Sequence, residues 1–258
     1  MIEAVVFDWA GTTVDYGCFA PVQAFVEAFA HFGIEVTMEE TRKPMGMLKI
    51  EHIRTMTKMK RIAKLWEEKY GRSANDADMR TIYEQFEPKL LSILHRYSSP
   101  KPFVLDVVAA LRQMRLKIGS TTGYTDKMME IVVPEAEKQG YCPDCWFSPD
   151  SVGGKGRPYP YMMFRNVQQL QVSSVQNVVK VGDIISDIKE GVNSGVWSVG
   201  VIEGSSELGL SREEWEALFD AERSFRVKQV EDSFRSAGAH FVVKNMSELS
   251  PLIQMLGI

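Results

Sequence analysis

The sequence predicts an α/β protein in which an all-helical domain is inserted into a doubly wound parallel sheet. Over residues 103–258, short apolar runs alternate with helical patterns, which is typical of parallel βα units. One further apolar run, at residues 4–7, stands apart, because the chain that follows it shows only helical periodicity. A segment rich in Ser and Pro, residues 98–102, closes this helical stretch. We therefore expect two units with these bounds: a Rossmann-like core of residues 1–18 and 99–258, and a helical cap of residues 19–98.

The first half of the chain is expected to hold one strand and a series of helices. Residues 4–7, AVVF, have the length and composition of a strand buried on both faces. Apolar residues then recur at helical spacing, as Phe25 and Phe29 do. Gly71 is expected to end the fourth helix, and Pro88 to kink the fifth. The predicted helices begin near residue 19 and at the Thr37–Glu40 capping box, and then cover 45–58, 60–69 and 75–97.

The second half of the chain is expected to hold five more strands, each joined to the next by a helix. The strands are predicted at 116–121, near Trp146, and at 177–181, 196–201 and 240–243. The helices are predicted at 103–114, at 125–139, from Tyr159 onward, at 185–194 and 211–236, and at the end of the chain. Parallel strands end at one edge of their sheet, which is where α/β folds place their ligands.

The composition limits the class of function. With 258 residues, 45% of them apolar and 25% charged, the chain has the balance of a globular protein. Its net charge of -4 argues against a broad nucleic-acid-binding surface. No apolar run reaches the roughly 18 residues that cross a bilayer, and the amino-terminal MIEAVVFDWAG lacks the basic region of a signal peptide. We therefore expect a cytoplasmic protein with neither a nucleic-acid nor a membrane partner.

The cysteines are consistent with a reducing compartment. Three cysteines are too few for a disulfide framework. Cys142 and Cys145 form a C-x-x-C pattern, but the other Cys and His residues offer no second close pair to complete a zinc site. Two unrelated thiols in a loop are therefore expected.

Polar residues gather at the predicted carboxyl ends of the strands. Asp8 follows the first strand, Thr122 and Gly123 follow the second, and Asp183 follows a later one, with Asp187 four residues on. A carboxylate near a helix amino terminus is also stabilising by itself, and this interpretation stays open for Asp183 or Asp187 taken singly. It does not explain three carboxylates at neighbouring strand ends. Such a cluster repels itself unless a cation lies within it, and oxygen ligands alone favour Mg²⁺.

The same residues carry a resemblance to a known family. Asp8-x-x-Gly11-Thr12-Thr13, Thr122, Arg157-Pro158-x-Pro160 and Gly182-Asp183-x-x-x-Asp187 resemble the four ordered motifs of the haloacid dehalogenase-like hydrolases. The resemblance covers nearly the whole chain, including a helical cap between the first two motifs. It implies that Asp8 is a nucleophile that accepts a phosphoryl group.

One position departs from the phosphatases of that family. They carry a second Asp two residues after the nucleophile, which protonates the leaving oxygen and then activates water, whereas this chain has Ala10. Proton donation of this kind contributes roughly 10²–10⁴-fold to a rate. A phosphate ester would lose that contribution here, so either the protein is inactive or the leaving group is stabilised in another way.

Lys49 is the candidate residue for stabilising the leaving group without an acid at position 10. On a helix over 45–58, Lys49 lies on the same face as Met45, His52 and Met56, the apolar side of the helix. A lysine whose stem packs while its ammonium reaches water would give the same pattern. In the alternative interpretation the amine is desolvated, which favours its neutral form and suits it to forming an imine.

An imine would suit a substrate whose phosphorus is bonded to carbon next to an aldehyde, because the electrons of the broken bond could enter the imine. The sequence resembles the branch of the family that cleaves such bonds, in the run Met45–His52, in Ala10 and in the run 204–209. The resemblance implies hydrolysis of phosphonoacetaldehyde to acetaldehyde and phosphate, with Lys49 forming the imine.

The resemblance also implies the remaining roles. Mg²⁺ would be held by Asp8, the backbone carbonyl of Ala10 and Asp183, with Asp187 as a ligand or a supporting residue. Phosphoryl oxygens would be bound by Thr122, the amide of Gly123 and Arg157, for which Lys155 is a competitor. The residues expected to line or support the site are Cys18, Met45, His52 and Tyr124. A homodimer formed through the cap is implied as well.

Two other functions remain open from the sequence. One is a phosphatase or phosphomutase of the same family that acts on a small phosphate ester with a different acid. The other is a binding or regulatory protein that lost activity with Ala10, although such a protein would have no reason to keep Asp8, Asp183, Arg157 and Lys49 together.

Overall fold

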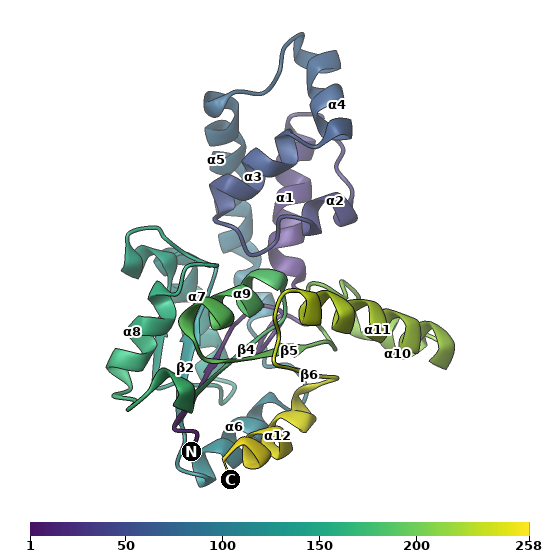
Figure 1. The fold of residues 1–258 in the computed structure, drawn as a ribbon. Helices are drawn as coiled ribbons and strands as arrows, with labels where there is room; N and C mark the ends of the chain where they lie inside the picture. Colours follow the sequence, from purple (N-terminus) through teal and green to yellow (C-terminus); the bar gives the residue numbers. More distant parts are fainter. Residues whose placement is uncertain (258) are drawn as a thin grey trace.

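The computed structural model describes residues 1–257 and confirms the predicted fold class, an α/β core with an inserted helical unit (Figure 1). Six parallel strands form one sheet in the order β3-β2-β1-β4-β5-β6. The chain therefore winds outward from β1 in both directions, and the switch point lies between β1 and β4. The strands are β1 (Ala4–Phe7), β2 (Lys117–Thr121), β3 (Cys145–Phe147), β4 (Val178–Gly182), β5 (Trp197–Val201) and β6 (Phe241–Val243).

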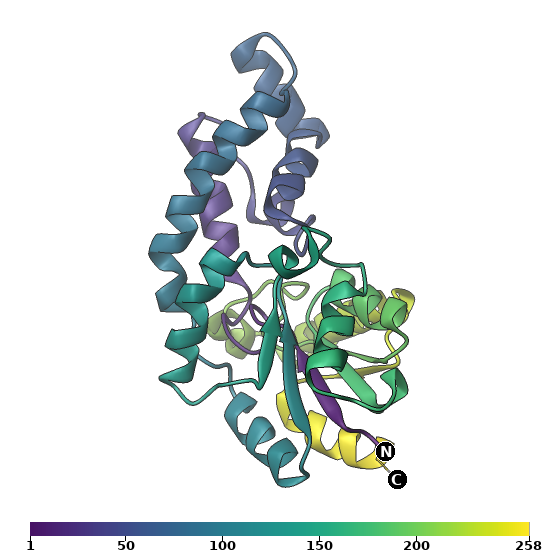
Figure 2. The ribbon, with the colours of Figure 1, turned by 90° about the vertical axis from the view of Figure 1, so that its left-hand side faces the viewer.

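Strand β1 is buried on both faces, as its apolar run predicts. Val5 and Phe7 pack into the larger apolar cluster, whereas Ala4 and Val6 pack into a second cluster with Met163. This alternation follows from the two-residue period of a strand. Helices α6 and α12 lie together on one side of the sheet, and α8 and α9 lie on the other (Figures 1 and 2). A central strand covered in this way holds Asp8, the next residue, in a fixed place.

The helices of the core follow the predicted alternation. They are α6 (Val104–Gln113), α7 (Asp126–Glu137), α8 (Tyr161–Gln169), α9 (Ile185–Ser194), α10 (Arg212–Ala217), α11 (Asp220–Ser236) and α12 (Leu249–Leu256). The single helical stretch predicted over 211–236 is thus two helices. Leu218, between them, has ψ near 139°, which is an extended backbone. None of the helices among the described residues combines the length and apolar character needed to cross a membrane.

The helical unit lies between β1 and β2 in the chain and stands at the sheet's carboxyl edge (Figure 2). Helices α1 and α5 lie side by side along it. Its helices are α1 (Phe19–His31), α2 (Met38–Arg42), α3 (Lys49–Thr57), α4 (Lys60–Tyr70) and α5 (Asp76–Ile93), followed by the 3₁₀ turn Leu94–Tyr97. The predicted capping box is present, since Thr37 accepts from the Glu40 amide and Glu40 accepts from the Thr37 amide.

Two details of the helical unit differ from the sequence prediction. The helix predicted over 45–58 begins only at Lys49, because Gly46 has φ near +88° and residues 43–46 form a turn. The helix predicted over 75–97 ends at Ile93, and the 3₁₀ turn Leu94–Tyr97 follows it; Pro88 lies inside this helix. Gly71 ends α4 in the left-handed conformation, with φ near 69°, as expected.

Two chain segments connect the helical unit to the core, and they lie side by side. Val14 forms an isolated antiparallel bridge with Pro100, and the Lys101 amide donates to the Thr13 carbonyl at 2.8 Å. The connection that follows the first strand is thus tied to the connection that precedes α6.

Candidate active site

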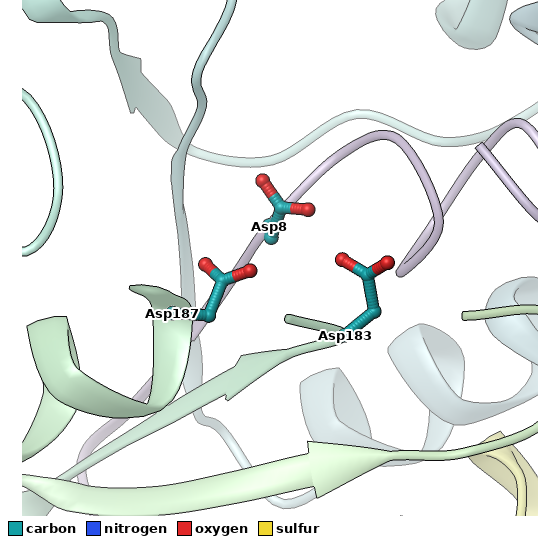
Figure 3. Close-up of side chains that lie close together, drawn as sticks. All are labelled: Asp8, Asp183 and Asp187. Atoms are coloured by element: carbon teal, nitrogen blue, oxygen red, sulfur yellow. The ribbon is translucent and has the colours of Figure 1, made fainter. Parts of the chain in front are cut away.

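Three carboxylates meet at the switch point of the sheet. Asp8 directly follows β1, Asp183 directly follows β4, and Asp187 lies in the first turn of α9. Their side chains point toward one another (Figure 3), and one oxygen from each lies within 4.8 Å of the others. Within residues 1–257 this is the one group of three or more acidic, His or Cys side chains placed to share an ion. All three are buried.

The loop after β1 is shaped to bring the carboxylates together. Gly11 has φ near +88°, and a β-carbon there would lie 2.1 Å from Asp183 Oδ2, so only glycine fits. The Thr12 hydroxyl lies 3.1 Å from Asp183 Oδ1 and 3.3 Å from Asp8 Oδ2, and can donate to either. The Ser206 amide donates to Asp183 Oδ2 at 2.7 Å. The glycine and threonine of the first motif therefore fix the distance between Asp8 and Asp183.

The carboxylates differ in their tendency to ionise. Burial raises the pKa of Asp183 well above its usual range, and the neighbouring charges of Asp8 and Asp187 raise it further. Burial also opposes the charge of Asp8, but Arg157 and Lys180 hold its pKa below the ordinary value. Asp187 Oδ2 has no hydrogen-bond partner among residues 1–257. Such a set of oxygen atoms fits a divalent cation, which would relieve the repulsion within the cluster.

Arg157 reaches the cluster from the segment before α8. It forms an ion pair with Asp8, and its Nη2 also donates to the Thr121 carbonyl at 3.0 Å. Its Nε lies 3.1 Å from Asp187 Oδ1. Lys155, the competing cation, is exposed. The structure therefore places Arg157, and not Lys155, next to the nucleophile candidate.

A small cavity joins the strand ends to the helical unit. It measures about 30 Å³, which leaves room for about one water molecule. Asp8, Ala10, Thr122, Gly123 and Arg157 border it from the core. Tyr124, in the segment after β2, and Cys18, directly before α1, border it as well, and Met45, Gly46 and Lys49 border it from the helical unit. Most of the residues that the sequence analysis singled out therefore meet around one small cavity.

Lys49 is buried at this cavity, with 6% of its surface exposed. Its Nζ lies 5.2 Å from the centre of the Tyr124 ring. Burial lowers the pKa of Lys49 from 10.5 to about 8, a shift that Cys18 partly opposes and Arg157 reinforces. The structure thus favours a desolvated amine over a lysine that reaches water.

His52 and the cysteines of the C-x-x-C pattern lie away from the cavity. His52 is buried within the helical unit, where Nε2 lies 2.8 Å from the Thr41 carbonyl and the ring stacks on Phe25 with centroids 3.9 Å apart. It supports the segment behind Lys49 and does not line the cavity. Cys142 and Cys145 are free thiols, one exposed and one half-buried.

Three buried charged residues near the site were not singled out from the sequence. Lys180 lies in β4 and Glu190 in α9, and both contact the ion pairs around Arg157. Lys101 donates to the carbonyls of Gly11 and Glu203. The available signal was a lysine in the middle of the predicted strand 177–181, where an apolar residue is the rule.

Comparisons with known proteins place the chain among others of this architecture. The family model described as haloacid dehalogenase-like hydrolase matches residues 2–195. The phosphonoacetaldehyde hydrolase of Bacillus cereus (strain G9842) is 51% identical over 253 residues, covering 98% of this chain and 96% of the relative. A bifunctional phosphonoacetaldehyde hydrolase/aminoethylphosphonate transaminase of Clostridioides difficile (strain 630) is 53% identical over 252 residues, and the match covers 98% of this chain but only 40% of that longer protein.

A solved structure is similar over the same length. The crystal structure of a phosphonoacetaldehyde hydrolase like protein from Oleispira antarctica has a TM-score of 0.95 and 38% identity, covering 99% of this chain and 92% of that chain. The similarity therefore includes the helical unit as well as the sheet.

Proposed function

Because this chain belongs to the haloacid dehalogenase-like hydrolases and, within them, to the phosphonoacetaldehyde hydrolases, we propose that it cleaves the carbon–phosphorus bond of phosphonoacetaldehyde, releasing acetaldehyde and phosphate. The observation that carries the proposal is the cavity between Asp8 and Lys49. It combines a nucleophile candidate with a buried amine, and Ala10 stands where a phosphatase has its proton donor.

Lys49 begins the reaction in this proposal. Its neutral amine adds to the aldehyde carbon, and loss of water leaves a protonated imine. A pKa near 8 makes the neutral amine far more abundant at pH 7 than in a free lysine. The carbon that carries phosphorus is then next to an electron-accepting group.

Asp8 performs the phosphoryl transfer. An oxygen of its carboxylate attacks phosphorus, the carbon–phosphorus bond breaks, and the bond's electron pair moves into the imine to give an enamine on Lys49. Arg157, next to Asp8, and the Thr122–Gly123 segment at the end of β2 would bind the phosphoryl oxygens. No acid is needed at Ala10, because the leaving group is never an alkoxide.

Two hydrolyses complete the cycle. The enamine takes a proton on carbon, and water then hydrolyses the resulting imine to acetaldehyde and free Lys49. Water also hydrolyses the phosphorylated Asp8 to phosphate and the free carboxylate. The small volume of the cavity, which Met45 and Tyr124 line, would limit the access of water before the transfer has occurred.

Mg²⁺ is the proposed cofactor. Asp8, the backbone carbonyl of Ala10 and Asp183 would hold it, with Asp187 beside them, and when bound it would supply positive charge that offsets the repulsion between Asp8 and an anionic substrate. The raised pKa of Asp183 supports this assignment, since burial and the charges of Asp8 and Asp187 outweigh the opposing charge of Lys101.

We also propose the domain division, the assembly and the location. Residues 1–18 and 99–258 would form the catalytic core, and residues 19–98 a cap that opens to admit substrate, because a cavity of about 30 Å³ is too small for it. A homodimer and a cytoplasmic location belong to the same proposal, the latter because all three cysteines are free thiols.

An assay of the two products tests the proposed function. The purified protein is incubated with phosphonoacetaldehyde, with and without Mg²⁺, and acetaldehyde and phosphate are measured together. Equal amounts of both, formed only with Mg²⁺, are expected. Turnover of a simple phosphate ester such as p-nitrophenyl phosphate at an equal or greater rate would instead favour the alternative phosphatase. Isomerisation of a sugar phosphate without release of phosphate would favour a phosphomutase.

A further inference from the structure

A charged pair lies beneath the site, inside the apolar core. Lys180 is the middle residue of β4, between Val179 and Val181, and is fully buried. Glu190, on α9, is fully buried as well, and their charged groups are 3.3 Å apart. A buried ion pair rarely contributes more stability than apolar residues of the same size. Its presence in the central strand therefore points to a role other than stability.

The pair contacts the same groups that hold Arg157. Lys180 Nζ donates to Thr121 Oγ1 at 2.7 Å and lies 2.9 Å from Asp187 Oδ1. The Thr121 hydroxyl donates to Glu190 Oε2 at 2.9 Å, and Arg157 Nε lies 3.4 Å from that same oxygen. Thr121 is thus a shared contact of both members of the pair, and its carbonyl accepts from Arg157.

The charges explain why Arg157 needs this arrangement. Its guanidinium lies among three carboxylates, Asp8 on one side and Asp187 and Glu190 on the other. Without Lys180, the two carboxylates of α9 would attract the guanidinium away from Asp8. With Lys180 between them, the α9 side is partly neutralised, and Nη2 can remain directed at Asp8.

We propose that Lys180 and Glu190 are positioning residues, which hold the Arg157 guanidinium beside Asp8 and orient Asp187. This role rests on the proposed function. Neither residue borders the cavity, so both act through Arg157, Asp187 and Thr121. Lys49 lies across the cavity in the helical unit, so imine formation does not depend on the pair.

Neutral variants separate positioning from stability. The variants are Lys180→Met, Glu190→Gln and the double variant, with Lys189→Met, an exposed neighbour on α9, as the matched control. The double variant removes both charges together and is expected to fold, because it leaves no unpaired buried charge from this pair. We measure kcat and KM for phosphonoacetaldehyde, the affinity for inorganic phosphate by calorimetry, and the yield of borohydride trapping at Lys49.

Each variant of the pair is expected to lose about 10²-fold in kcat, since small displacements of a positioned group have effects of this size. Phosphate affinity is expected to fall about tenfold or more, because Arg157 would donate charge-assisted hydrogen bonds to it. Trapping at Lys49 and all values for the control should stay at the wild-type level. A purely structural pair predicts that the folded double variant regains wild-type kcat and phosphate affinity, which would overturn the proposal, as would a parallel loss of trapping.

Thr121→Val provides an independent test if the charge variants do not fold. It keeps the shape of the side chain and every charge but removes the hydroxyl that joins the pair. A drop in kcat and phosphate affinity with unchanged trapping is expected, and wild-type values would contradict the proposal. The wild-type protein tests the proposed function separately. If it shows no turnover of phosphonoacetaldehyde, the proposed function fails, but the phosphate affinities of the variants can still be compared.

Discussion

Lys49 shows how burial can favour the reactive, neutral form of an amine at a cost in stability. Its pKa is lowered because burial disfavours the ammonium, and the neutral amine that results is the form that attacks an aldehyde. The ammonium that remains at neutral pH has no ion-pair partner within 4.0 Å among the described residues. The same desolvation that prepares the amine therefore weakens the folded state.

The first prediction concerns the pH dependence of imine formation. With a pKa of about 8, the neutral fraction of Lys49 grows about tenfold for each pH unit below that value and then levels off. The rate of borohydride trapping at Lys49 should follow this curve between about pH 6 and pH 9. A rate that continues to rise to pH 10 would show an amine with an ordinary pKa.

The second prediction concerns stability. Folding lowers the pKa of Lys49, so the folded state binds fewer protons between pH 8 and 10.5, and stability should rise with pH in that window. Lys49→Met should weaken this slope and raise the unfolding free energy at pH 7 by about 1–3 kcal/mol. Denaturant unfolding measures both effects, with Lys58→Met, an exposed position directly after α3, as the control. A destabilised Lys49→Met protein would contradict the account.

The third prediction uses two glycines that share a backbone conformation. Gly11 and Gly71 have φ near +88° and +69°, but a β-carbon at Gly11 would meet Asp183 Oδ2 at 2.1 Å, whereas one at Gly71 meets nothing within 4 Å. Gly11→Ala should therefore abolish phosphonoacetaldehyde hydrolysis and weaken Mg²⁺ binding, measured by calorimetry. Gly71→Ala should cost only about 1 kcal/mol and leave both unchanged. Equal effects of the two substitutions would be inconsistent with a role for the Gly11 loop in spacing the carboxylates.

At the scale of elements, the two connections between core and cap are joined by one buried lysine. Lys101 donates to the Gly11 carbonyl, and at 2.9 Å to the Glu203 carbonyl, and its Nζ lies 5.5 Å from the centre of the Tyr16 ring. It thus ties the segment after α5 to the loop that follows Asp8 and to the loop that carries Ser206. Movement of the cap would act on the site through these contacts.

The fourth prediction tests that connection. Lys101→Met removes the donor to the buried Gly11 carbonyl and to the half-buried Glu203 carbonyl, so the unfolding free energy should fall by about 1–3 kcal/mol. The loop after Asp8 would lose its anchor, and kcat should fall about tenfold or more. Thermal unfolding and steady-state kinetics measure the two effects, with Lys89→Met, on α5 of the cap, as the control. A stable variant with normal kcat would show that Lys101 does not hold the loop.

At the scale of the whole molecule, the cap and core meet across a second, larger cavity. It encloses about 740 Å³ and is lined by α2 on one side and by residues 206–210 on the other. Arg42 crosses this interface, since its Nη1 donates to the Gly17 carbonyl at 2.6 Å and its guanidinium lies 4.8 Å from the centre of the Phe19 ring. This cavity shares Met45, Ile184 and Ser206 with the cavity at the site, so the two adjoin.

The fifth prediction follows from that contact. Arg42→Gln should weaken the closed form and raise KM for phosphonoacetaldehyde about tenfold, since a hydrogen bond to a charged group contributes roughly 1.5–3 kcal/mol. Lys43→Gln is the matched control, because Lys43 lines the same cavity but is exposed and, among residues 1–257, pairs with Glu39 alone. Equal KM values for the two variants would show that the contacts of Arg42 do not hold the cap closed.

The fold was largely predictable, and the exceptions have local causes. Strands buried on both faces appear in the sequence as continuous apolar runs, and this pattern alone places Asp8 and Asp183 at strand ends. The predicted start of α3 was wrong because Met45 shares the helical spacing of Lys49, His52 and Met56, while Gly46 adopts a left-handed conformation that a helix does not contain. Hydrophobic spacing carries no information about that dihedral angle.

Site residues could be predicted from the sequence only where they belong to a local sequence motif. Asp8, Lys49 and Arg157 stand in motifs, and the structure brings them to one cavity. Lys180, Glu190 and Lys101 depend on partners far away in the sequence, so their contacts could not be read from local patterns. His52 lies on the same helix face as Lys49, but it does not reach the cavity. Lys49, the first residue of α3, borders the cavity, and His52 lies one turn further along the helix.

The central claim is that Lys49 carries the substrate as an imine while Asp8 receives the phosphoryl group. Borohydride is added during turnover of phosphonoacetaldehyde, and the digested protein is examined by mass spectrometry. An N-ethyl or N-phosphonoethyl group is expected on Lys49 alone, together with irreversible loss of activity, and Lys49→Arg should show neither the adduct nor acetaldehyde release. A wild-type protein that turns over substrate without this adduct, or a Lys49→Arg variant that still cleaves the carbon–phosphorus bond, would contradict the account.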